Sequence, residues 1–290
     1  MHFFDSEFLK SVVNDSDTRH QQVSVGQFEG KLKRIILPDI VIDHGEYNLK
    51  LIAQGAFSPN TVTFMIVHHM GEIGKVCGAD LIGGSLIVLP VHADAEFTIP
   101  QNTIWTAINV PKKHLEKYGL EVKATQLFTL DKKNFTHFNQ IYLQIEKQLS
   151  KGTESQEILQ DMILSHFIEA IEDLENKLEL RYSDRYMIAL NIRDYIIENI
   201  VEPLQMYKLC QLTNKSVRTI ERTFKQVFNL SVREYHSSYR LFLVRQTLLH
   251  DKNTSVSSAA LKYGFFHLSR FSSNYKKLFM ELPSQTLTRK

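Results

Sequence analysis

The last hundred residues contain two copies of one pattern, in which a short amphipathic helix, a break and a second helix with a basic face follow one another. The copies occupy residues 206–228 and 256–279. In the first copy, residues 213–215 interrupt the helical period, and the Ser216 hydroxyl can cap the helix that follows. In the second copy, Gly264 suits the left-handed end of the first helix, and Phe265 is expected to plug the turn. Each copy is predicted to be a helix-turn-helix unit.

The second helix of each unit carries apolar residues at three- and four-residue steps, which predicts a buried stripe. These stripes consist of Val217, Ile220, Phe224, Val227 and Phe228 in the first unit and of Leu268, Phe271, Tyr275 and Leu278 in the second. The opposite faces are basic and polar, which suits the major groove of DNA, where Arg reaches guanine edges and Lys meets phosphate. The predicted DNA-binding residues are Arg218, Glu221, Arg222, Lys225, Ser269, Arg270, Ser272, Ser273 and Lys276.

The two units differ in how they are expected to read DNA. The first presents long charged side chains, whereas the second presents Ser269, Ser272 and Ser273, with Arg270 and Lys276 assigned to phosphates. We therefore expect weaker direct readout by the second unit, with more dependence on DNA shape.

One long helix is predicted between the two units, from Val232 to Leu249. At ~1.5 Å for each residue it spans roughly 27 Å. Such a rod can set two reading helices about one DNA turn, ~34 Å, apart on one face of the duplex.

Charge divides along the chain although the total is nearly neutral. Residues 185–290 contain 17 Lys and Arg against 7 Asp and Glu, a formal charge of +10, whereas residues 1–184 contain 17 against 25, a formal charge of −8. The basic part suits binding to DNA with release of counterions, and the acidic part is expected to face away from the phosphates.

The C-terminal motifs resemble those of the AraC/XylS family of transcription regulators. The resemblance covers about the last 105 residues and rests on Tyr239-Arg240-Leu241, Ala259 to Phe265, Phe271, Tyr275-Lys276 and Pro283-Ser284. More narrowly, Gly264 to Leu268 and Pro283 to Leu287 are similar to regulators of ethanolamine utilisation. Met280 stands where the family usually has Gly, which implies a strained left-handed residue at a helix end. The resemblance implies a bacterial transcription regulator that binds double-stranded DNA and acts with RNA polymerase.

The N-terminal part is predicted to be rich in β-strands. Short alternating or β-branched runs, separated by Gly, Pro, Asn and Asp, occupy residues 28–37, 40–47, 49–57, 61–70, 85–90 and 103–111. Strands at this spacing favour a small barrel or sandwich. The family resemblance implies a cupin-like barrel that senses a small molecule.

A helical stretch is predicted over residues 134–180, where a wide apolar stripe includes Leu178. This stripe can dock on the barrel or pair with a second chain, and the family resemblance favours a homodimer. The expected fold is thus α+β with two domains: a β-rich sensor domain (1–133) followed by a helical dimerisation segment (134–180), a linker (181–187), and an all-α DNA-binding domain (188–290) with two helix-turn-helix motifs joined by a long helix.

Candidates for an effector site combine aromatic side chains with neutral polar ones. They are His44, Tyr47, Phe57, Phe64, His68 and Trp105. No catalytic motif or cofactor-binding loop is evident in the sequence. Metal-ligand spacing is not evident either, since the adjacent His68 and His69 of one strand are expected to point to opposite faces. An enzyme built on a metal-binding barrel is therefore disfavoured. A DNA-binding regulator without an effector, controlled by its abundance or by a protein partner, stays open as the alternative.

Nothing in the sequence suggests a membrane. No run of about 18 apolar residues is present, and the acidic N-terminal end lacks a signal-peptide pattern. Cys77 and Cys210 have no metal-ligand spacing and are expected to be reduced packing residues. We expect a soluble, cytoplasmic protein.

Overall fold

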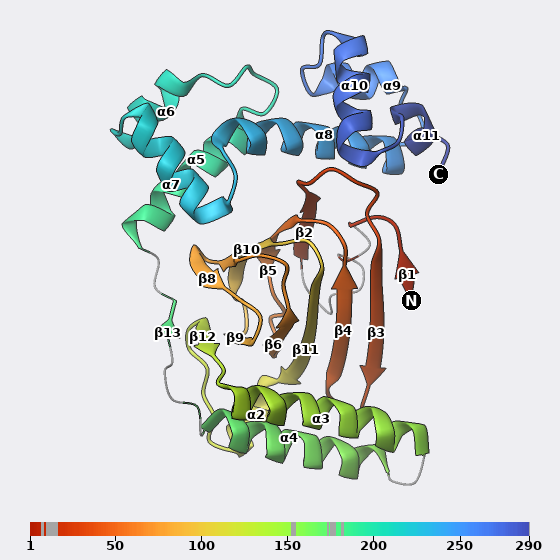
Figure 1. Ribbon diagram of the computed structural model, residues 1–290, viewed down its shortest axis with the longest axis vertical. Helices are drawn as coiled ribbons and strands as arrows, with labels where there is room; N and C mark the ends of the chain where they lie inside the picture. The colour runs from red at the N-terminus through yellow and green to blue at the C-terminus, as the bar shows by residue number, and fades with distance from the viewer. Residues whose placement is uncertain are drawn as a thin grey trace.

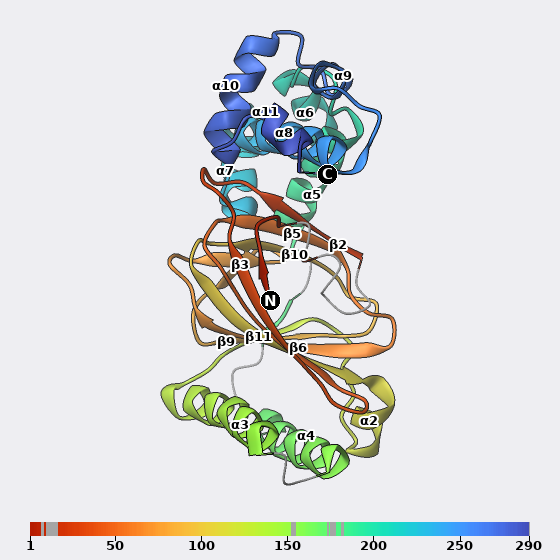
Figure 2. The same cartoon turned by 90° about the vertical axis from the view of Figure 1, so that its right-hand side faces the viewer.

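The computed structural model describes residues 1–6, 9, 17–151, 155–172, 174, 178–180 and 183–289. A β-rich body lies in the middle, helices α3 (Lys132–Lys151) and α4 (Gln156–Glu172) cover one end of it, and the C-terminal helices lie at the other end (Figures 1 and 2). The predicted α+β architecture, with a sheet-rich N-terminal part and a helical C-terminal part, is confirmed. None of the helices in the described ranges is long and apolar enough to cross a membrane.

Two antiparallel sheets form the β-rich body. The larger has, in spatial order, β1 (His2–Phe3), β3 (Gly30–Ile36), β4 (Val41–Tyr47), β11 (Thr103–Pro111), β6 (Thr61–His69), β9 (Ser85–Leu89), β12 (Gln126–Thr129) and β13 (Leu178–Glu179). The smaller has β2 (Asp17–Gln22), β5 (Leu51–Ala56), β10 (Asp94–Ile99), β7 (Gly74–Val76) and β8 (Ala79–Leu81). Their facing sides share one apolar core.

The six predicted strands are confirmed as β3, β4, β5, β6, β9 and β11. Strand β2 was not predicted, because its sequence Asp-Thr-Arg-His-Gln-Gln has no aliphatic residue. It pairs with β5 over its whole length and packs against helix α8 (Val232–His250). Tertiary contacts thus override a low intrinsic strand propensity.

The helical middle of the chain docks on the outer face of the larger sheet. Phe167 of α4 meets Phe64 of β6, with ring centroids 5.1 Å apart, and Phe138 of α3 packs on Phe167 at 5.2 Å. The short helix α2 (Lys112–Lys117) precedes this pair. The predicted helical stripe ends too late, because Leu178 lies in strand β13 and is 53% exposed.

The C-terminal helices are α5 (Asp184–Glu198), α6 (Met206–Thr213), α7 (Val217–Phe228), α8, α9 (Val256–Lys262), α10 (Leu268–Phe279) and α11 (Pro283–Leu287). They confirm both helix-turn-helix patterns and the long helix between them. The predicted linker 181–187 is too long, because α5 already begins at Asp184 and Tyr186 is buried in the same core as Cys77.

The ends of both second helices rest on the smaller sheet and its loops. At the end of α7, the Phe228 carbonyl accepts from the Thr98 hydroxyl of β10 (3.2 Å). Near the end of α10, the Leu278 carbonyl accepts from the Gly26 amide (3.0 Å) and from the Gln22 side chain (3.1 Å). Because the last carbonyls of a helix have no partner within the helix, these bonds satisfy groups that would otherwise need water.

Helices α8 and α5 add further contacts between the two parts. On α8, Ser238 accepts from the Gln21 side chain (2.9 Å) and Tyr239 accepts from Arg19, both of β2. On α5, Arg193 forms a buried ion pair with Glu96 of β10. Strands β2 and β10 therefore carry several of the polar contacts to the C-terminal helices.

His20 of β2 makes stability depend on pH. The ring is buried between the sheets, and this burial lowers its pKa from 6.5 to about 4. Above pH 6.5 the ring is neutral in both the folded and the unfolded chain, so the stability is unaffected. As the pH falls from 6.5 to 4, only the unfolded chain takes up the proton, and the folded chain therefore loses stability. At ~1.4 kcal/mol for each pKa unit, the loss from this one residue is about 3 kcal/mol.

Burial also lowers the pKa of His68 and His236 to about 4, so three rings contribute to the dependence. We predict that His20→Gln lowers the slope of stability against pH between pH 6.5 and 4 by about a third, as measured by urea unfolding at several pH values. His166→Gln, on the exposed face of α4, is the matched control and should keep the wild-type slope. An unchanged slope in His20→Gln would contradict the assignment of His20 as a buried neutral ring.

Candidate DNA interface

Helix α7 separates a buried face from a basic one. The Ser216 hydroxyl accepts from the Thr219 amide (3.3 Å), which confirms the predicted N-cap. Ile220, Phe224 and Phe228 are fully buried. Three of the predicted DNA-binding residues of this helix are exposed, namely Arg218, Arg222 and Lys225.

Glu221 differs from these three residues. It is half-buried, and its carboxylate accepts from the backbone amide of Val232 (3.3 Å), the first residue of α8. A carboxylate at the start of a helix also interacts favourably with the helix dipole. The Glu221 side chain is therefore held on α8, where it fixes the angle between α7 and α8.

Helix α10 repeats the arrangement with shorter side chains. Phe271 and Tyr275 are buried, and Ser272 is half-buried. The other predicted DNA-binding residues of this unit are exposed, namely Ser269, Arg270, Ser273 and Lys276. The predicted burial of Leu268 is wrong: this first residue of the helix projects beyond the core and is 40% exposed. Val217, at the same place in α7, is likewise 47% exposed.

The ends of α9 and α10 have the conformations that the sequence predicted. Gly264 has a φ of +74°, as predicted for the end of α9. Phe265 packs on Phe271, with centroids 5.1 Å apart, which confirms the predicted plug. Met280 adopts a left-handed conformation with a φ of 56°, so the strain expected of a non-glycine residue at this position is present.

Helix α8 joins the two units and contacts both of them, through the Glu221 carboxylate at its start and through Arg240 near its middle. At its start, Ser231 and Glu234 form a reciprocal capping box. Farther along, Arg240 donates to the Tyr263 carbonyl (2.8 Å) and stacks over the Phe265 ring at 4.2 Å. The helix has 19 residues, which at ~1.5 Å each corresponds to roughly 28 Å. Both reading helices are therefore anchored to one rod.

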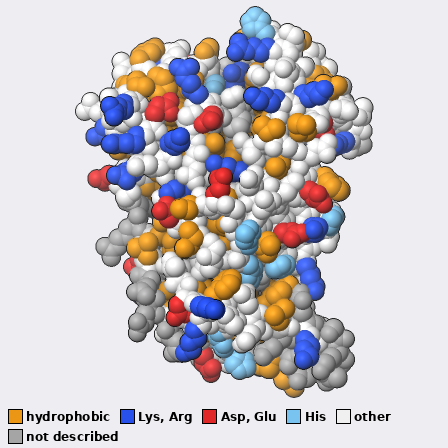
Figure 3. All heavy atoms as spheres, viewed as in Figure 1, with side chains coloured by type: hydrophobic (Ala, Val, Ile, Leu, Met, Phe, Trp, Pro, Cys, Tyr) orange, Lys and Arg blue, Asp and Glu red, His pale blue; other side chains and the backbone are white. Residues whose placement is uncertain are grey.

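Lys and Arg side chains gather over the C-terminal helices, whereas Asp and Glu lie mainly lower on the molecule (Figure 3). The division matches the formal charges of +10 for residues 185–290 and −8 for residues 1–184. The electrostatic field thus favours approach of an anionic polymer to the helical end.

The six candidates for an effector site do not form one site. Tyr47, Phe57 and Trp105 line a cavity of about 40 Å³ between the two sheets. The other three, His44, Phe64 and His68, lie on the opposite face of the larger sheet, below α3 and α4. The division follows from the alternation of side chains along a strand, which sends neighbouring residues to opposite faces of the sheet.

His44 and His68 share one hydroxyl group beneath α3. The Thr106 hydroxyl lies 2.9 Å from His44 Nδ1 and 2.7 Å from His68 Nε2. The His44 ring also stacks on Tyr142 of α3, with centroids 4.9 Å apart. Burial and the neighbouring His44 lower the pKa of His68 to about 4. His68 is thus a neutral packing residue between the sheet and α3.

The expectation that His68 and His69 point to opposite faces is wrong. A register shift between β11 and β6 pairs Ile104 with His69 and Trp105 with Val67, so His68 is an extra residue of a β-bulge. Both rings consequently lie on the outer face. Within the described ranges, no three His, Cys, Asp or Glu side chains come together as metal ligands.

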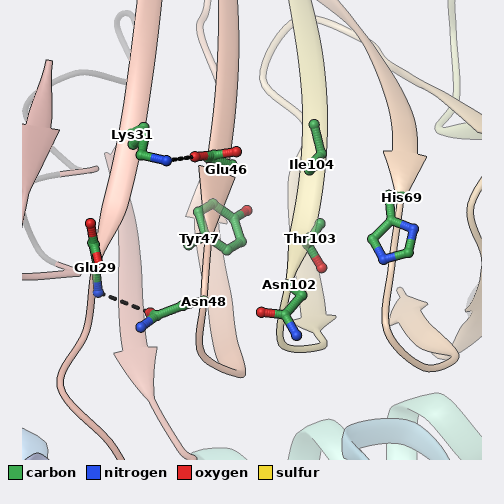
Figure 4. Close-up of a pocket in the computed structure, with 9 residues that line it drawn as sticks. All are labelled: Glu29, Lys31, Glu46, Tyr47, Asn48, His69, Asn102, Thr103 and Ile104. Atoms are coloured by element: carbon green, nitrogen blue, oxygen red, sulfur yellow. Dashed lines mark hydrogen bonds and ion pairs between the residues drawn. The ribbon is translucent and has the colours of Figure 1, made fainter.

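A second hollow, of about 250 Å³, opens on the outer face of the larger sheet, near the strand ends that face the C-terminal helices (Figure 4). Lys31 and Glu46 form an ion pair across β3 and β4, and the Glu29 amide donates to the Asn48 side chain (2.9 Å). His69 lines the other side. Of the six predicted candidates, Tyr47 also lines this hollow. The other lining residues were not predicted, because they come from four strands and look like ordinary surface residues in the sequence.

Comparison with known proteins identifies the helical end. A family model described as a helix-turn-helix domain matches residues 209–289. The "XylDLEGF operon transcriptional activator 1" of Pseudomonas putida is 35% identical over 99 residues, which are 33% of this chain and 30% of that protein. The C-terminal domain is of the AraC/XylS type. The AraC/XylS resemblance found in the sequence is therefore confirmed for this domain.

Other relatives differ in how much of the chain they match. The "HTH-type transcriptional activator RhaR" of Mannheimia succiniciproducens is 22% identical over 224 residues, covering 77% of this chain and 72% of that protein. A transcriptional regulator with an AraC-type DNA-binding domain from Chromobacterium violaceum, of known structure, is 27% identical over 36% of this chain and 91% of its own, with a TM-score of 0.34. The chain spans about a third of the length of the first Pseudomonas putida relative.

We predict that Arg222→Ala weakens binding to a specific DNA sequence by ~1–3 kcal/mol and relaxes the preference at one base pair. Because the Arg222 side chain is exposed, the melting temperature should stay that of the wild type. Binding is measured by fluorescence anisotropy on duplexes selected by the protein and on random duplexes. Lys123→Ala, an exposed cation of the β-rich part, is the control. Equal losses on both kinds of DNA would contradict a base-reading role.

Proposed function

We propose that this chain is a DNA-binding transcription regulator that reads two adjacent major-groove segments. The observation that carries the proposal is the pair of recognition helices, α7 and α10, which expose basic and polar faces and are joined by one long helix in an AraC/XylS-type domain. The domain bounds predicted from the sequence, with the DNA-binding domain at 188–290, are part of this proposal, adjusted for the start of α5 at Asp184.

The residues of the interface have separate roles in this proposal. Arg218 and Arg222 reach guanine edges in the first segment, because guanidinium groups donate to the two acceptors of guanine. Lys225, Arg270 and Lys276 meet phosphates. Ser269, Ser272 and Ser273 face the bases of the second segment, while Glu221 acts by positioning α7 relative to α8.

The proposal predicts that the full chain enriches one sequence from a pool of random duplexes. Affinity for that sequence should fall about linearly on a logarithmic scale as salt rises, with a slope of roughly 0.9 for each phosphate contact. Arg218→Ala should reduce both enrichment and affinity. A chain that enriches no sequence, or whose affinity does not depend on salt, would be no DNA-reading regulator.

We further propose that a small-molecule effector acts through the cavity between the sheets. Strands β2 and β10 lie between this cavity and the C-terminal helices. Successive side chains of each strand point alternately into the cavity and toward the helices. On β10, Phe97 and Ile99 line the cavity, whereas Thr98 donates to the end of α7. On β2, His20 lines the cavity, whereas Gln21 donates to α8. A ligand that displaces either strand would therefore move a contact of the DNA-binding domain.

The chemistry of the cavity favours a small, mainly apolar ligand with a few polar groups. Aromatic rings form much of the wall, and the Gln54 amide oxygen is buried without a hydrogen-bond partner among the residues described. A buried oxygen of this kind can accept from a ligand hydroxyl or amine. The narrower resemblance to ethanolamine regulators adds ethanolamine to the compounds to test, although the apolar wall suits this polar cation less well than a mainly apolar ligand.

A substitution that fills the cavity tests whether an effector binds there. In Ala107→Leu the larger side chain projects into the space of about 40 Å³ and should abolish any ligand-induced rise in melting temperature. DNA binding should persist, because Ala107 is remote from α7 and α10. Ala56→Leu, at the exposed end of β5, is the control. If no small metabolite shifts the melting temperature of the wild type, the alternative of a regulator without an effector is favoured.

We also propose that the chain pairs as a homodimer and contacts RNA polymerase. Although α3 and α4 dock on the sheet, their outward side still exposes Leu143 (60%) and Ile158 (62%). Exposed aliphatic residues on a helix pair suit a second copy of the same pair. Sedimentation of the wild type and of Leu143→Glu tests this pairing: a monomeric wild type would contradict it.

A further inference from the structure

The turn between α9 and α10 forces one aromatic residue outward. Gly264 ends α9, and an added Cβ there would lie 2.5 Å from the Val201 carbonyl, so the turn is tightly enclosed. Phe265 is held inward between Phe271 and the Arg240 guanidinium. The next residue, Phe266, consequently faces solvent and is 72% exposed. Its exposure is a result of a fixed turn geometry.

Phe266 and Leu268 form an apolar tip at the start of α10. The end of α10 is bonded to Gly26 of the β-rich body, so its start is the end farther from that body (Figure 1). The first turn of a recognition helix is the part that meets base edges in the major groove. The apolar tip therefore occupies the base-reading end of the second unit.

An internal comparison shows that the two units present different chemistry. Helices α7 and α10 each have 12 residues and each end in a left-handed residue, so their positions correspond one to one. Arg218 and Arg222 correspond to Ser269 and Ser273. Lys215, two residues before α7, corresponds to Phe266. The second unit thus has apolar surface and hydroxyls where the first has cations.

We propose that Phe266 and Leu268 read thymines in the second DNA segment by contact with their 5-methyl groups. The inference rests on the proposed function and specifies its target sequence. Among the base edges of the major groove, thymine alone presents an apolar methyl group. Arg270 and Lys276, both exposed on α10, supply the phosphate contacts that hold the helix in place. The first unit reads guanine through its Arg side chains, and the second reads thymine through apolar contact.

Replacement of thymine by deoxyuridine tests the proposal directly, because it removes only the methyl group. The duplex is the one that the full chain enriches from a random pool, with each thymine of the second protected segment replaced in turn. For the wild type we expect a loss of about fourfold in affinity at one or two of these positions, the value for one buried methyl-sized group. Replacements outside the protected segments should have no effect.

The matched variants are Phe266→Ser and, independently, Leu268→Ser. Each should bind the thymine duplex more weakly than the wild type and no longer distinguish thymine from deoxyuridine at its position. Phe4→Ser, which removes another exposed aromatic ring (60%) in the β-rich part, should behave as the wild type. The melting temperature should be unchanged, because the Phe266 ring is exposed.

Three results would overturn the inference. Equal affinity of the wild type for thymine and deoxyuridine throughout the second segment would reject methyl readout and leave the proposed function standing. Reduced transcription with unaltered DNA binding in Phe266→Ser would assign the tip to a protein partner. Enrichment of no sequence at all would reject both the proposed function and this inference.

Discussion

The placement of both recognition helices depends on hydrogen bonds between their last carbonyl groups and the β-rich body. Thr98 donates to Phe228 at the end of α7, and Gly26 and Gln22 donate to Leu278 near the end of α10. Helix α8, which connects the two units, rests on β2 between these points. The β-rich body thus acts together with the rod α8 in setting the distance and angle between α7 and α10. Their first turns are left free at the opposite end.

This arrangement explains how a change within the β-rich body could reach the DNA-binding surface. A strand presents successive side chains to opposite faces, so β10 directs Phe97 into the cavity and Thr98 toward α7. Glu96, two residues before Thr98 on the same face of β10, forms a buried ion pair with Arg193 of α5. Coupling therefore needs no long pathway: one strand separates the cavity from the helix that it would control.

Much of the fold follows from local patterns in the sequence. The helix-turn-helix units, the cap at Ser216, the plug at Phe265 and the left-handed Met280 all depend on residues close in the chain, and all are confirmed.

Contacts between distant segments of the chain could not be predicted from these local patterns. Strand β2 lacks a strand-like sequence and forms because β5 and α8 enclose it. The candidates for the effector site mixed two faces of one sheet, because tertiary packing decides which face of each strand turns toward the smaller sheet and which toward α3 and α4. Helical periodicity predicted that Leu268 is buried, but the first turn of α10 extends beyond the core and leaves this side chain exposed.

The proposed function requires α7 and α10 to act as one rigid reader with a fixed spacing. The most direct measurement is the affinity of the full chain for its selected duplex after insertion of five base pairs between the two protected segments. The insertion rotates one segment by about half a helical turn, out of reach of a rigid pair of helices. For a rigid pair, we expect affinity to fall to that of a duplex with the first segment alone. Unchanged affinity would show instead that the two helices bind independently of each other.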